Sequence, residues 1–341
     1  MKQIDVDTLR GWLENGQPVT VLDIRNSDDR AQWSIPGSMH VNAYAALKAG
    51  DPNALQQVEL PVGRPVVTIC NAGVVSQEAA EQLSRRGMDA AALVGGMKSW
   101  SLAWNTADLP LGDLTIVQVR RTGKGCLSYL MASDAQAVVI DASLDPTVYV
   151  RLADQHGWAI RYVLDTHVHA DHLSRSRILA ELTRATLLLP RQNRVRFTFT
   201  PVRDGDKLEF GNTTLHVIAT AGHTTESTSY LVNGQALFTG DALFLSSVGR
   251  PDLKASSTEA ESRARMIFRS LQHLLELSGK TIVFPGHTSE PPAFDGRPIC
   301  DELNRVSSRI AAWLRSEDDF VCTILDRIPP TPPNYFLLFL N

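Results

Sequence analysis

The chain has 341 residues, of which 43% are hydrophobic and 21% are charged, and this composition excludes a disordered, collagen-like or coiled-coil protein. Its length suggests two domains, each large enough to bury a core. The formal net charge of −4, from 33 basic and 37 acidic side chains, provides no basic field that would hold nucleic acid or an anionic membrane. We therefore expect neither a nucleic-acid partner nor a membrane partner.

The first part of the chain alternates short β-branched runs with helical patterns. Residues 19–24 and 66–70 are typical of strands buried on both faces, and residues 76–86 are typical of a helix. This alternation predicts a small α/β domain with a parallel sheet. A polar stretch with a proline, residues 105–113, is expected to separate it from the rest, which gives domains at 1–107 and 113–341.

The second part of the chain interleaves strands and helices without strict alternation, which predicts an α/β sandwich with mixed sheets. We expect strands at 115–119, 126–131, 137–141 and 215–219, and helices at 146–155, 173–184, 257–277 and 300–315.

The four cysteines, Cys70, Cys126, Cys300 and Cys322, form no C-x-x-C pair, so neither a disulfide framework nor a thiolate-rich zinc site is expected. The first residues contain no apolar core of a secretory signal, and no apolar stretch approaches the roughly 20 residues of a membrane span. We expect a cytoplasmic protein in which a single cysteine is available as a reactive thiol.

Cys70 ends the strand at 66–70 and is followed by a short loop with Gly73 and by a helix that starts near Ser76. Backbone N–H groups and the helix dipole at such a position favour negative charge on the sulfur, which predicts a lowered pKa and a nucleophilic thiol. A buried structural cysteine is the alternative.

Four segments in this part resemble the rhodanese (sulfurtransferase) family in order and spacing: V-L-D-I-R at 21–25, W-S-I-P-G-S-M-H-V-N at 33–42, the Cys70 loop, and G-G-M-K-S-W at 95–100. The resemblance covers about residues 1–105. It implies that Cys70 is the sulfur-accepting nucleophile and that a cradle around the persulfide is formed by Asn71, Ala72, Gly73, Val74, Val75 and Ser76.

The Cys70 loop departs from the family at two positions. Many rhodanese loops carry arginines after the cysteine, whereas this chain has Asn71 and Val75. A neutral loop suits a persulfide or a thiol carrier at least as well as thiosulfate.

Metal-capable side chains follow the ends of four expected strands in the second part. The strand at 161–166 ends in His167-Val-His169-Ala-Asp171-His172, and further strands end at His223, Asp241 and His287, each directly after a glycine. Imidazole and carboxylate ligands suit Fe(II), Zn(II) or Mn(II). His216 and His273 lie within a strand and a helix pattern, so we expect them to be structural or exposed.

These residues resemble the metallo-β-lactamase fold superfamily over roughly 113–341, which implies an αββα sandwich. The T-H-x-H-A-D-H motif occurs in thioester hydrolases of the glyoxalase II type and in persulfide dioxygenases. Resemblance to the dioxygenases implies that this chain binds one Fe(II) through His167, His223 and Asp241. The other candidates would then orient ligands or waters: His169, Asp171, His172 and His287. In the hydrolases, all seven residues would bind two zinc ions, and Asp241 would bridge them.

Three features favour the dioxygenase. Residues 125–130 with 137–141 resemble the entry strands of that branch, Gly249-Arg-Pro-Asp-Leu253 resembles its G-R-x-D segment, and a persulfide is a species that both domains can share. Glu226 stands where many hydrolases have glycine. We expect Arg250 to contact an anionic group of the substrate, with an ion pair to Asp252 as the alternative.

The sequence therefore predicts a persulfide dioxygenase that oxidises glutathione persulfide or a related low-molecular-weight persulfide to sulfite with O2. Its activity is expected to be coupled to sulfur transfer through a persulfide on Cys70, with thiosulfate or sulfite as a partner. The alternatives are a dinuclear zinc thioester hydrolase with an attached sulfur-carrier domain, and a sensor protein that uses Cys70 as a detector. A homo-oligomer is left open.

Overall fold

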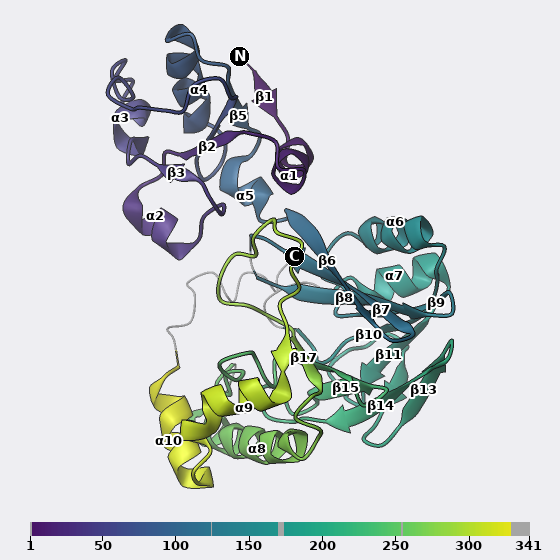
Figure 1. Ribbon diagram of the computed structural model, residues 1–341. Helices are drawn as coiled ribbons and strands as arrows, with labels where there is room; N and C mark the ends of the chain where they lie inside the picture. Colours follow the sequence, from purple (N-terminus) through teal and green to yellow (C-terminus); the bar gives the residue numbers. More distant parts are fainter. Residues whose placement is uncertain (1, 124, 170–173, 254, 329–341) are drawn as a thin grey trace. The chain divides into compact units, whose positions relative to one another are not determined.

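The structure is a computed structural model that describes residues 2–123, 125–169, 174–253 and 255–328 (Figure 1). The chain divides into two compact units, which are described separately. The first contains Met1–Ala107, Arg120–Cys126 and Ser289–Arg297, and the second contains Asp108–Val119, Leu127–Thr288 and Pro298–Asn341.

The first unit is built on a five-stranded parallel sheet with the order β1-β5-β4-β2-β3. Its strands are β1 Gln3–Ile4, β2 Thr20–Asp23, β3 Met39–His40, β4 Val66–Ile69 and β5 Ala90–Leu93, and its helices are α1 Val6–Glu14, α2 Ser27–Gln32, α3 Tyr44–Lys48, α4 Val75–Arg85 and α5 Gly96–Trp100. Every residue of β2, β4 and β5 is buried. This confirms the predicted parallel α/β architecture, because strands covered on both faces are apolar throughout.

Two mixed sheets, with the orders β12-β11-β10-β9-β8-β7-β6 and β13-β14-β15-β16-β17-β18, form the second unit, except that Trp104–Ala107 of β6 and Arg120–Arg121 of β7 are counted with the first. The strands of the seven-stranded sheet are β6 Trp104–Leu111, β7 Leu114–Arg121, β8 Leu127–Ser133, β9 Gln136–Ile140, β10 Ala159–Leu164, β11 Thr186–Pro190 and β12 Thr200–Val202. Those of the six-stranded sheet are β13 Lys207–Phe210, β14 Thr213–Ala219, β15 Thr228–Val232, β16 Ala236–Gly240, β17 Ile282–Pro285 and β18 Asp301–Glu302.

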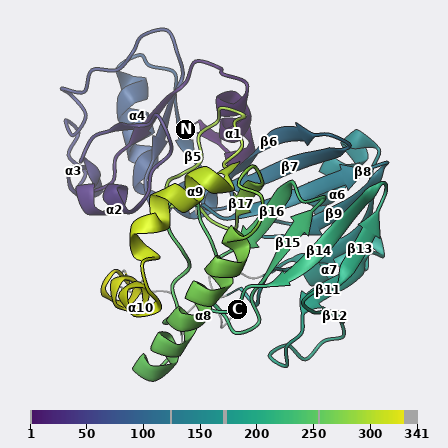
Figure 2. The same cartoon turned by 60° about the horizontal axis from the view of Figure 1, so that its bottom comes forward.

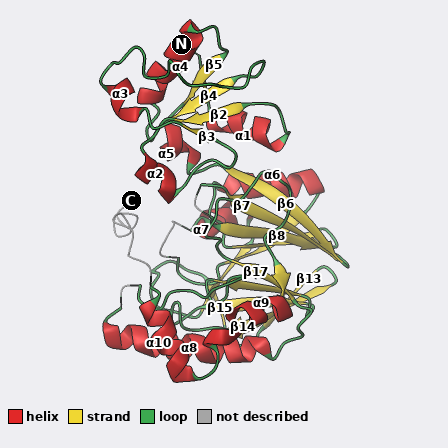
Figure 3. Cartoon of the chain, turned by 60° about the vertical axis from the view of Figure 1, so that its left-hand side comes forward, coloured by secondary structure: helices red, strands yellow, loops and turns green. Residues whose placement is uncertain are grey.

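Helices cover the outer faces of these two sheets (Figure 3). Helices α6 (Pro146–His156) and α7 (Ser176–Thr183) pack on the seven-stranded sheet, while α8 (Ser257–Leu275), α9 (Leu303–Ile310) and α10 (Glu317–Asp326) belong to the cluster on the six-stranded sheet. Figure 2 shows α8 and α9 beside this second sheet. Side chains such as Tyr129 and Phe238 fill the space between the sheets. The predicted αββα sandwich is therefore confirmed.

Two expected elements differ from the structure. Most of the separator expected at residues 105–113 belongs to strand β6, whose Asn105 and Ala107 are buried in alternation with more exposed neighbours. Pro110 is tolerated there because β6 is an edge strand. The helix expected at 300–315 starts only at Leu303, because Asp301 and Glu302 pair with β17. At its other end the helix stops at Ile310, and a short 3-10 turn follows at Ala311–Trp313.

Among the helices that the structure describes, none combines the length and the apolar character needed to cross a membrane.

Candidate metal centre and thiol site

Cys70 lies at the carboxyl end of β4, and its side chain points to the start of α4. The backbone N–H of Ser76, in the first turn of that helix, donates to Sγ over 3.4 Å, and Ser76 Oγ lies 3.4 Å from the same sulfur. Cys70 is only 1% exposed. The thiol therefore sits at a strand end against a helix N-terminus, where backbone N–H groups favour negative charge.

The G-G-M-K-S-W segment closes the Cys70 loop from the other side. Helix α5 begins at Gly96, and the N–H groups of Met97 and Lys98 donate to the carbonyl oxygens of Cys70 and Asn71 over 2.8 and 2.9 Å. A Cβ atom on Gly96, whose φ is +54°, would lie 2.1 Å from the oxygen of Cys70. Only glycine allows this approach, so the glycines of this segment hold the loop in shape.

The rim of the thiol loop is neutral to acidic. Residues 71–76 carry no charged side chain, and Val74 is 69% exposed. Asn71 donates through Nδ2 to a carboxylate oxygen of Asp29 over 2.6 Å. The charged group that is hydrogen-bonded to this rim is therefore the Asp29 carboxylate, which is negative.

The D-I-R motif forms a buried ion pair that supports Asp29. Arg25 donates to the Asp23 carboxylate through Nε and Nη2, and both side chains are almost fully buried. The same guanidinium donates to the carbonyl oxygens of Asp29 and Trp33 over 3.2 and 2.7 Å. Such a forked pair fixes the backbone of α2 relative to the sheet.

Three of the predicted metal-binding residues converge in the second unit. His167 follows β10, His223 follows β14 and Asp241 follows β16, and one potential ligand atom from each lies within 4.8 Å of the others. Nε2 of His223 is 3.6 Å from Oδ2 of Asp241. Two neutral imidazoles and one carboxylate form a donor set that suits Fe(II) or Zn(II). The residues present therefore fit a bound metal ion.

Hydrogen bonds orient both imidazole rings toward this convergence point. Nδ1 of His223 lies 3.0 Å from the carbonyl oxygen of Arg250. Nδ1 of His167 lies 2.9 Å from Thr166 Oγ1, and Thr166 donates its hydroxyl hydrogen to Asp141 Oδ2 over 2.9 Å. Each ring thus carries its proton on Nδ1 and keeps its lone pair on Nε2, which is the arrangement that metal-binding histidines need.

Gly240, the last residue of β16, lies next to the Thr166 hydroxyl that orients His167. Its φ is +50°, and a Cβ atom there would lie 2.3 Å from Thr166 Oγ1. A larger residue would displace the hydroxyl that holds His167.

Asp241 and His287 form a close pair. Nδ1 of His287 lies 2.6 Å from Asp241 Oδ1. Burial alone would raise the pKa of Asp241, but the pKa is held well below its usual range because His287, His223 and His167 surround the carboxylate. Asp241 is therefore ionised, with Oδ1 held by His287 and Oδ2 toward His223.

His169 belongs to a neighbouring cluster with two aspartates that the sequence did not single out as site residues. Its Nε2 is 3.0 Å from Asp141 Oδ1 and 3.9 Å from Asp165 Oδ1. Burial raises the pKa of Asp165, although His169 and two serine hydroxyls oppose the shift. Asp141 directly follows β9, so it obeys the same strand-end rule that identified the other residues. Asp171 and His172 lie outside the described residues.

Arg250 makes the ion pair that was the alternative in the sequence analysis. Its Nε and Nη2 donate to the two carboxylate oxygens of Asp252, each over 2.7 Å, and the side chain is 18% exposed. A contact between Arg250 and the substrate stays a prediction.

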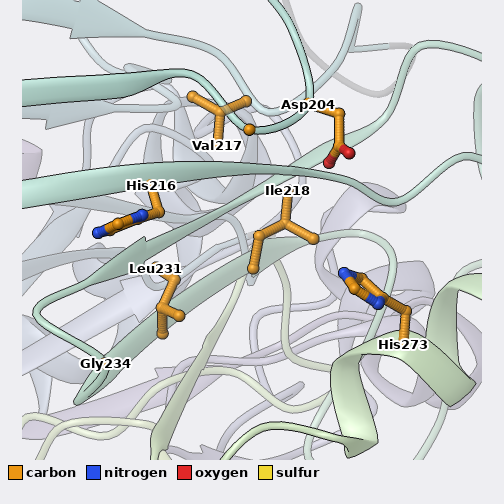
Figure 4. Close-up of a pocket in the computed structure, with 8 residues that line it drawn as sticks. Asp204, His216, Val217, Ile218, Leu231, Gly234 and His273 are labelled. Carbon is orange, nitrogen blue, oxygen red and sulfur yellow. The ribbon is translucent and has the colours of Figure 1, made fainter.

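A hollow of about 340 Å³ lies on the side of the six-stranded sheet that faces α8 (Figure 4). It is lined by Asp204, Gly205, His216, Val217, Ile218, Leu231, Gly234 and His273. Of the predicted metal-binding residues that the structure describes, none lines it. His216 is half-buried on β14 and His273 is exposed on α8, in agreement with the structural or exposed roles expected for them.

Comparison with known families assigns both parts of the chain. Residues 121–287 match the metallo-beta-lactamase superfamily, and residues 5–103 match the rhodanese-like domain. Among solved structures, ETHE1 from Myxococcus xanthus is 30% identical with a TM-score of 0.55, and the match covers 64% of this chain and 92% of that one. A metallo-beta-lactamase from Staphylococcus aureus is 24% identical with a TM-score of 0.60, covers 67% of this chain and 72% of that one, and shows the fold alone.

Two kinds of curated relatives match at similar identity. A hydroxyacylglutathione hydrolase from Brucella anthropi is 34% identical over 136 residues, which is 39% of this chain and 49% of that protein. The mitochondrial persulfide dioxygenase ETHE1 from Bos taurus is 28% identical over 171 residues, which is 48% of this chain and 65% of that protein. The chain thus spans about half to two thirds of the length of these relatives. The chain belongs to the metallo-beta-lactamase superfamily and carries a rhodanese-like domain at its N-terminal end.

Proposed function

We propose that the protein is a mononuclear iron persulfide dioxygenase coupled to sulfur transfer through Cys70. The reaction at the metal centre would be RSSH + O2 + H2O → RSH + SO3²⁻ + 2 H⁺, where RSH is a low-molecular-weight thiol such as glutathione. The observation that carries the proposal is the convergence of His167, His223 and Asp241 while His287 holds the other oxygen of Asp241.

His167, His223 and Asp241 would hold the iron. A ferrous ion bound there would supply one-electron chemistry toward O2 and toward a sulfur ligand. The backbone oxygen of Arg250 and the hydroxyl of Thr166 keep the two imidazole rings in the tautomer that binds metal. His287 holds Asp241 as an ionised ligand with one oxygen directed at His223.

The extent of the matches to ETHE1 supports the proposal. Compared by sequence, the match covers 65% of the Bos taurus ETHE1 and 49% of the hydroxyacylglutathione hydrolase, and by structure it covers 92% of the Myxococcus xanthus ETHE1 chain. A rhodanese-like domain in the same chain also fits a persulfide as the shared species, because Cys70 would carry one.

The Cys70 thiolate would accept sulfane sulfur by attacking the terminal sulfur of a donor. With a persulfide, a new S–S bond forms on Cys70 while the donor S–S bond breaks and the thiolate RS⁻ leaves. With thiosulfate, sulfite leaves instead. The N–H of Ser76 and the amino end of α4 would stabilise the anionic sulfur in either case.

Oxygen uptake tests the dioxygenase directly. The iron-loaded protein should consume O2 on addition of glutathione persulfide and produce one sulfite per O2, with about one iron per chain. Stoichiometric iron without uptake above that of free iron would contradict the proposal.

The second candidate is a dinuclear zinc thioester hydrolase, which the Brucella anthropi relative favours. Its additional ligands would be His169, His287, Asp171 and His172, of which the last two lie outside the described residues. About two zinc ions per active chain together with hydrolysis of S-acylglutathione would support this candidate.

A further inference from the structure

We infer that Arg194 binds a carboxylate of the substrate's thiol carrier beside the metal centre, and that the buried Glu226 positions it. The inference rests on the proposed function and adds to it the pair of residues that would recognise a carboxylate of the thiol carrier. Neither residue was assigned a role by the sequence motifs.

Glu226 connects Arg194 to the metal-binding loop. The Glu226 side chain is 4% exposed, and its Oε1 accepts one hydrogen bond from the backbone N–H of Val168 over 3.1 Å and another from Arg194 Nη1 over 2.8 Å. Val168 stands between His167 and His169. Because one oxygen atom serves both donors, the guanidinium lies next to the backbone of this loop.

Arg194 remains accessible to a ligand. Its side chain is 43% exposed, and a guanidinium has five N–H donors in a planar fork that can bind a carboxylate through two parallel hydrogen bonds. In Arg250, by contrast, both arms of the fork are taken by Asp252 and only 18% of the side chain is exposed. Of these two arginines, Arg194 is the better placed to receive an anionic group.

The surrounding charge also favours an anionic carrier. Glu226 neutralises one positive charge, but Arg196 is exposed on the same segment. Glu226 therefore fixes the direction of Arg194, while Arg196 keeps the local potential positive. An arginine that is already held in place loses less side-chain entropy when it binds a ligand.

The test compares Arg194→Gln with the matched control Arg191→Gln in the metal-loaded protein that contains all 341 residues. Calorimetry with S-methylglutathione, an unreactive analogue, measures binding without catalysis. We expect the Kd to rise about tenfold in Arg194→Gln, since a charge-assisted hydrogen bond is lost, and to stay within about twofold in Arg191→Gln. Equal Kd values for Arg194→Gln and the unchanged protein would overturn the inference. An equally large rise of the Kd in Arg191→Gln would overturn it too.

Kinetics separate carrier recognition from a general loss of activity. In Arg194→Gln, the KM for glutathione persulfide should rise about tenfold with little change in kcat, while the KM for the uncharged persulfide of 2-mercaptoethanol should stay the same. An equal rise for both persulfides would contradict a carboxylate contact. Glu226→Gln keeps an acceptor for Val168 but removes the charge, and it should weaken S-methylglutathione binding less than Arg194→Gln does.

The Kd for S-methylglutathione tests the role of Arg194 whichever reaction the metal centre catalyses. If the protein takes up no oxygen but hydrolyses S-acylglutathione, the proposed function fails while the Kd for S-methylglutathione still tests Arg194. If oxygen uptake is present and the Kd does not respond to Arg194→Gln, only the inference about the carrier fails.

Discussion

His223 donates its Nδ1–H to the backbone oxygen of Arg250 across 3.0 Å. A carbonyl oxygen can only accept a hydrogen bond, so the proton of the ring is fixed on Nδ1 and Nε2 is left to face Asp241. The side chain of Arg250 is meanwhile tied to Asp252. The G-R-P-D segment therefore shapes the metal centre through its backbone, and its ion pair holds that backbone in place.

Replacing Asp252 by Ala should weaken metal binding, because the segment that orients His223 loses its ion pair. We expect the metal affinity to fall about tenfold, as is typical when a group that orients a ligand is removed. Competition with a chelator measures it. Asp318→Ala, which breaks an exposed pair with Arg265, is the control and should leave the affinity unchanged.

Replacing His287 by Gln distinguishes one bound ion from two. In the mononuclear proposal, His287 acts on Asp241 by a hydrogen bond, so the variant should keep about one iron per chain with an affinity reduced by about tenfold. Metal analysis of the purified variant gives the answer. A drop from two ions to one per chain would identify His287 as a ligand and favour the zinc hydrolase.

Replacing Cys70 by Ser should separate the two activities. Sulfur transfer should disappear, because no thiolate remains to accept sulfane sulfur, while oxygen uptake on supplied glutathione persulfide should stay within about twofold. Cys322→Ser removes an exposed thiol and should change neither activity. Loss of both activities in Cys70→Ser would refute this division of labour.

Replacing Asp29 by Asn should improve the use of thiosulfate. The carboxylate of Asp29 contacts Asn71 at the rim of the thiol loop, where it repels a dianion. We expect the rate constant for persulfide formation on Cys70 from thiosulfate to rise about threefold at low ionic strength, and the gain to shrink as salt is added. Asp28→Asn, which removes the neighbouring exposed charge, should have a smaller effect. Equal effects of the two variants would assign the repulsion to net charge instead of to the Asn71 contact.

The half-buried thiol of Cys300 should make the fold sensitive to high pH. Burial, helped by Asp301, raises the pKa of Cys300 from 9.0 to about 11. The folded state therefore holds the thiol proton more tightly than the unfolded state, so its stabilising effect is complete below about pH 9 and is lost as the pH rises to about 11. After allowance for partial exposure, the free energy of unfolding should fall by about 1 kcal/mol over this range. Urea unfolding at several pH values measures it, and Cys300→Ser should remove this part of the decrease.

Much of the fold follows from local patterns in the sequence. Strands β2 and β4 were predicted within about a residue because apolar, β-branched runs bounded by loops are typical of buried parallel strands. The glycine-preceded residues His223 and Asp241 were found for a related reason, since both follow strands that end at the same edge of a sheet. Strand β6 was missed because its pattern is polar and contains a proline, which only an edge position tolerates.

The sequence by itself determined the two fold families, the thiol at a strand end and the types of residue available to a metal ion, because each of these is encoded by neighbours along the chain. The tertiary structure alone decided which group orients which ring. Asp141 reaches His167 through Thr166 from 25 residues away, and Glu226 joins Val168 to Arg194 across 58 and 32 residues. Contacts over such separations depend on how the strands are ordered in the sheets, and no periodicity within either segment records that order.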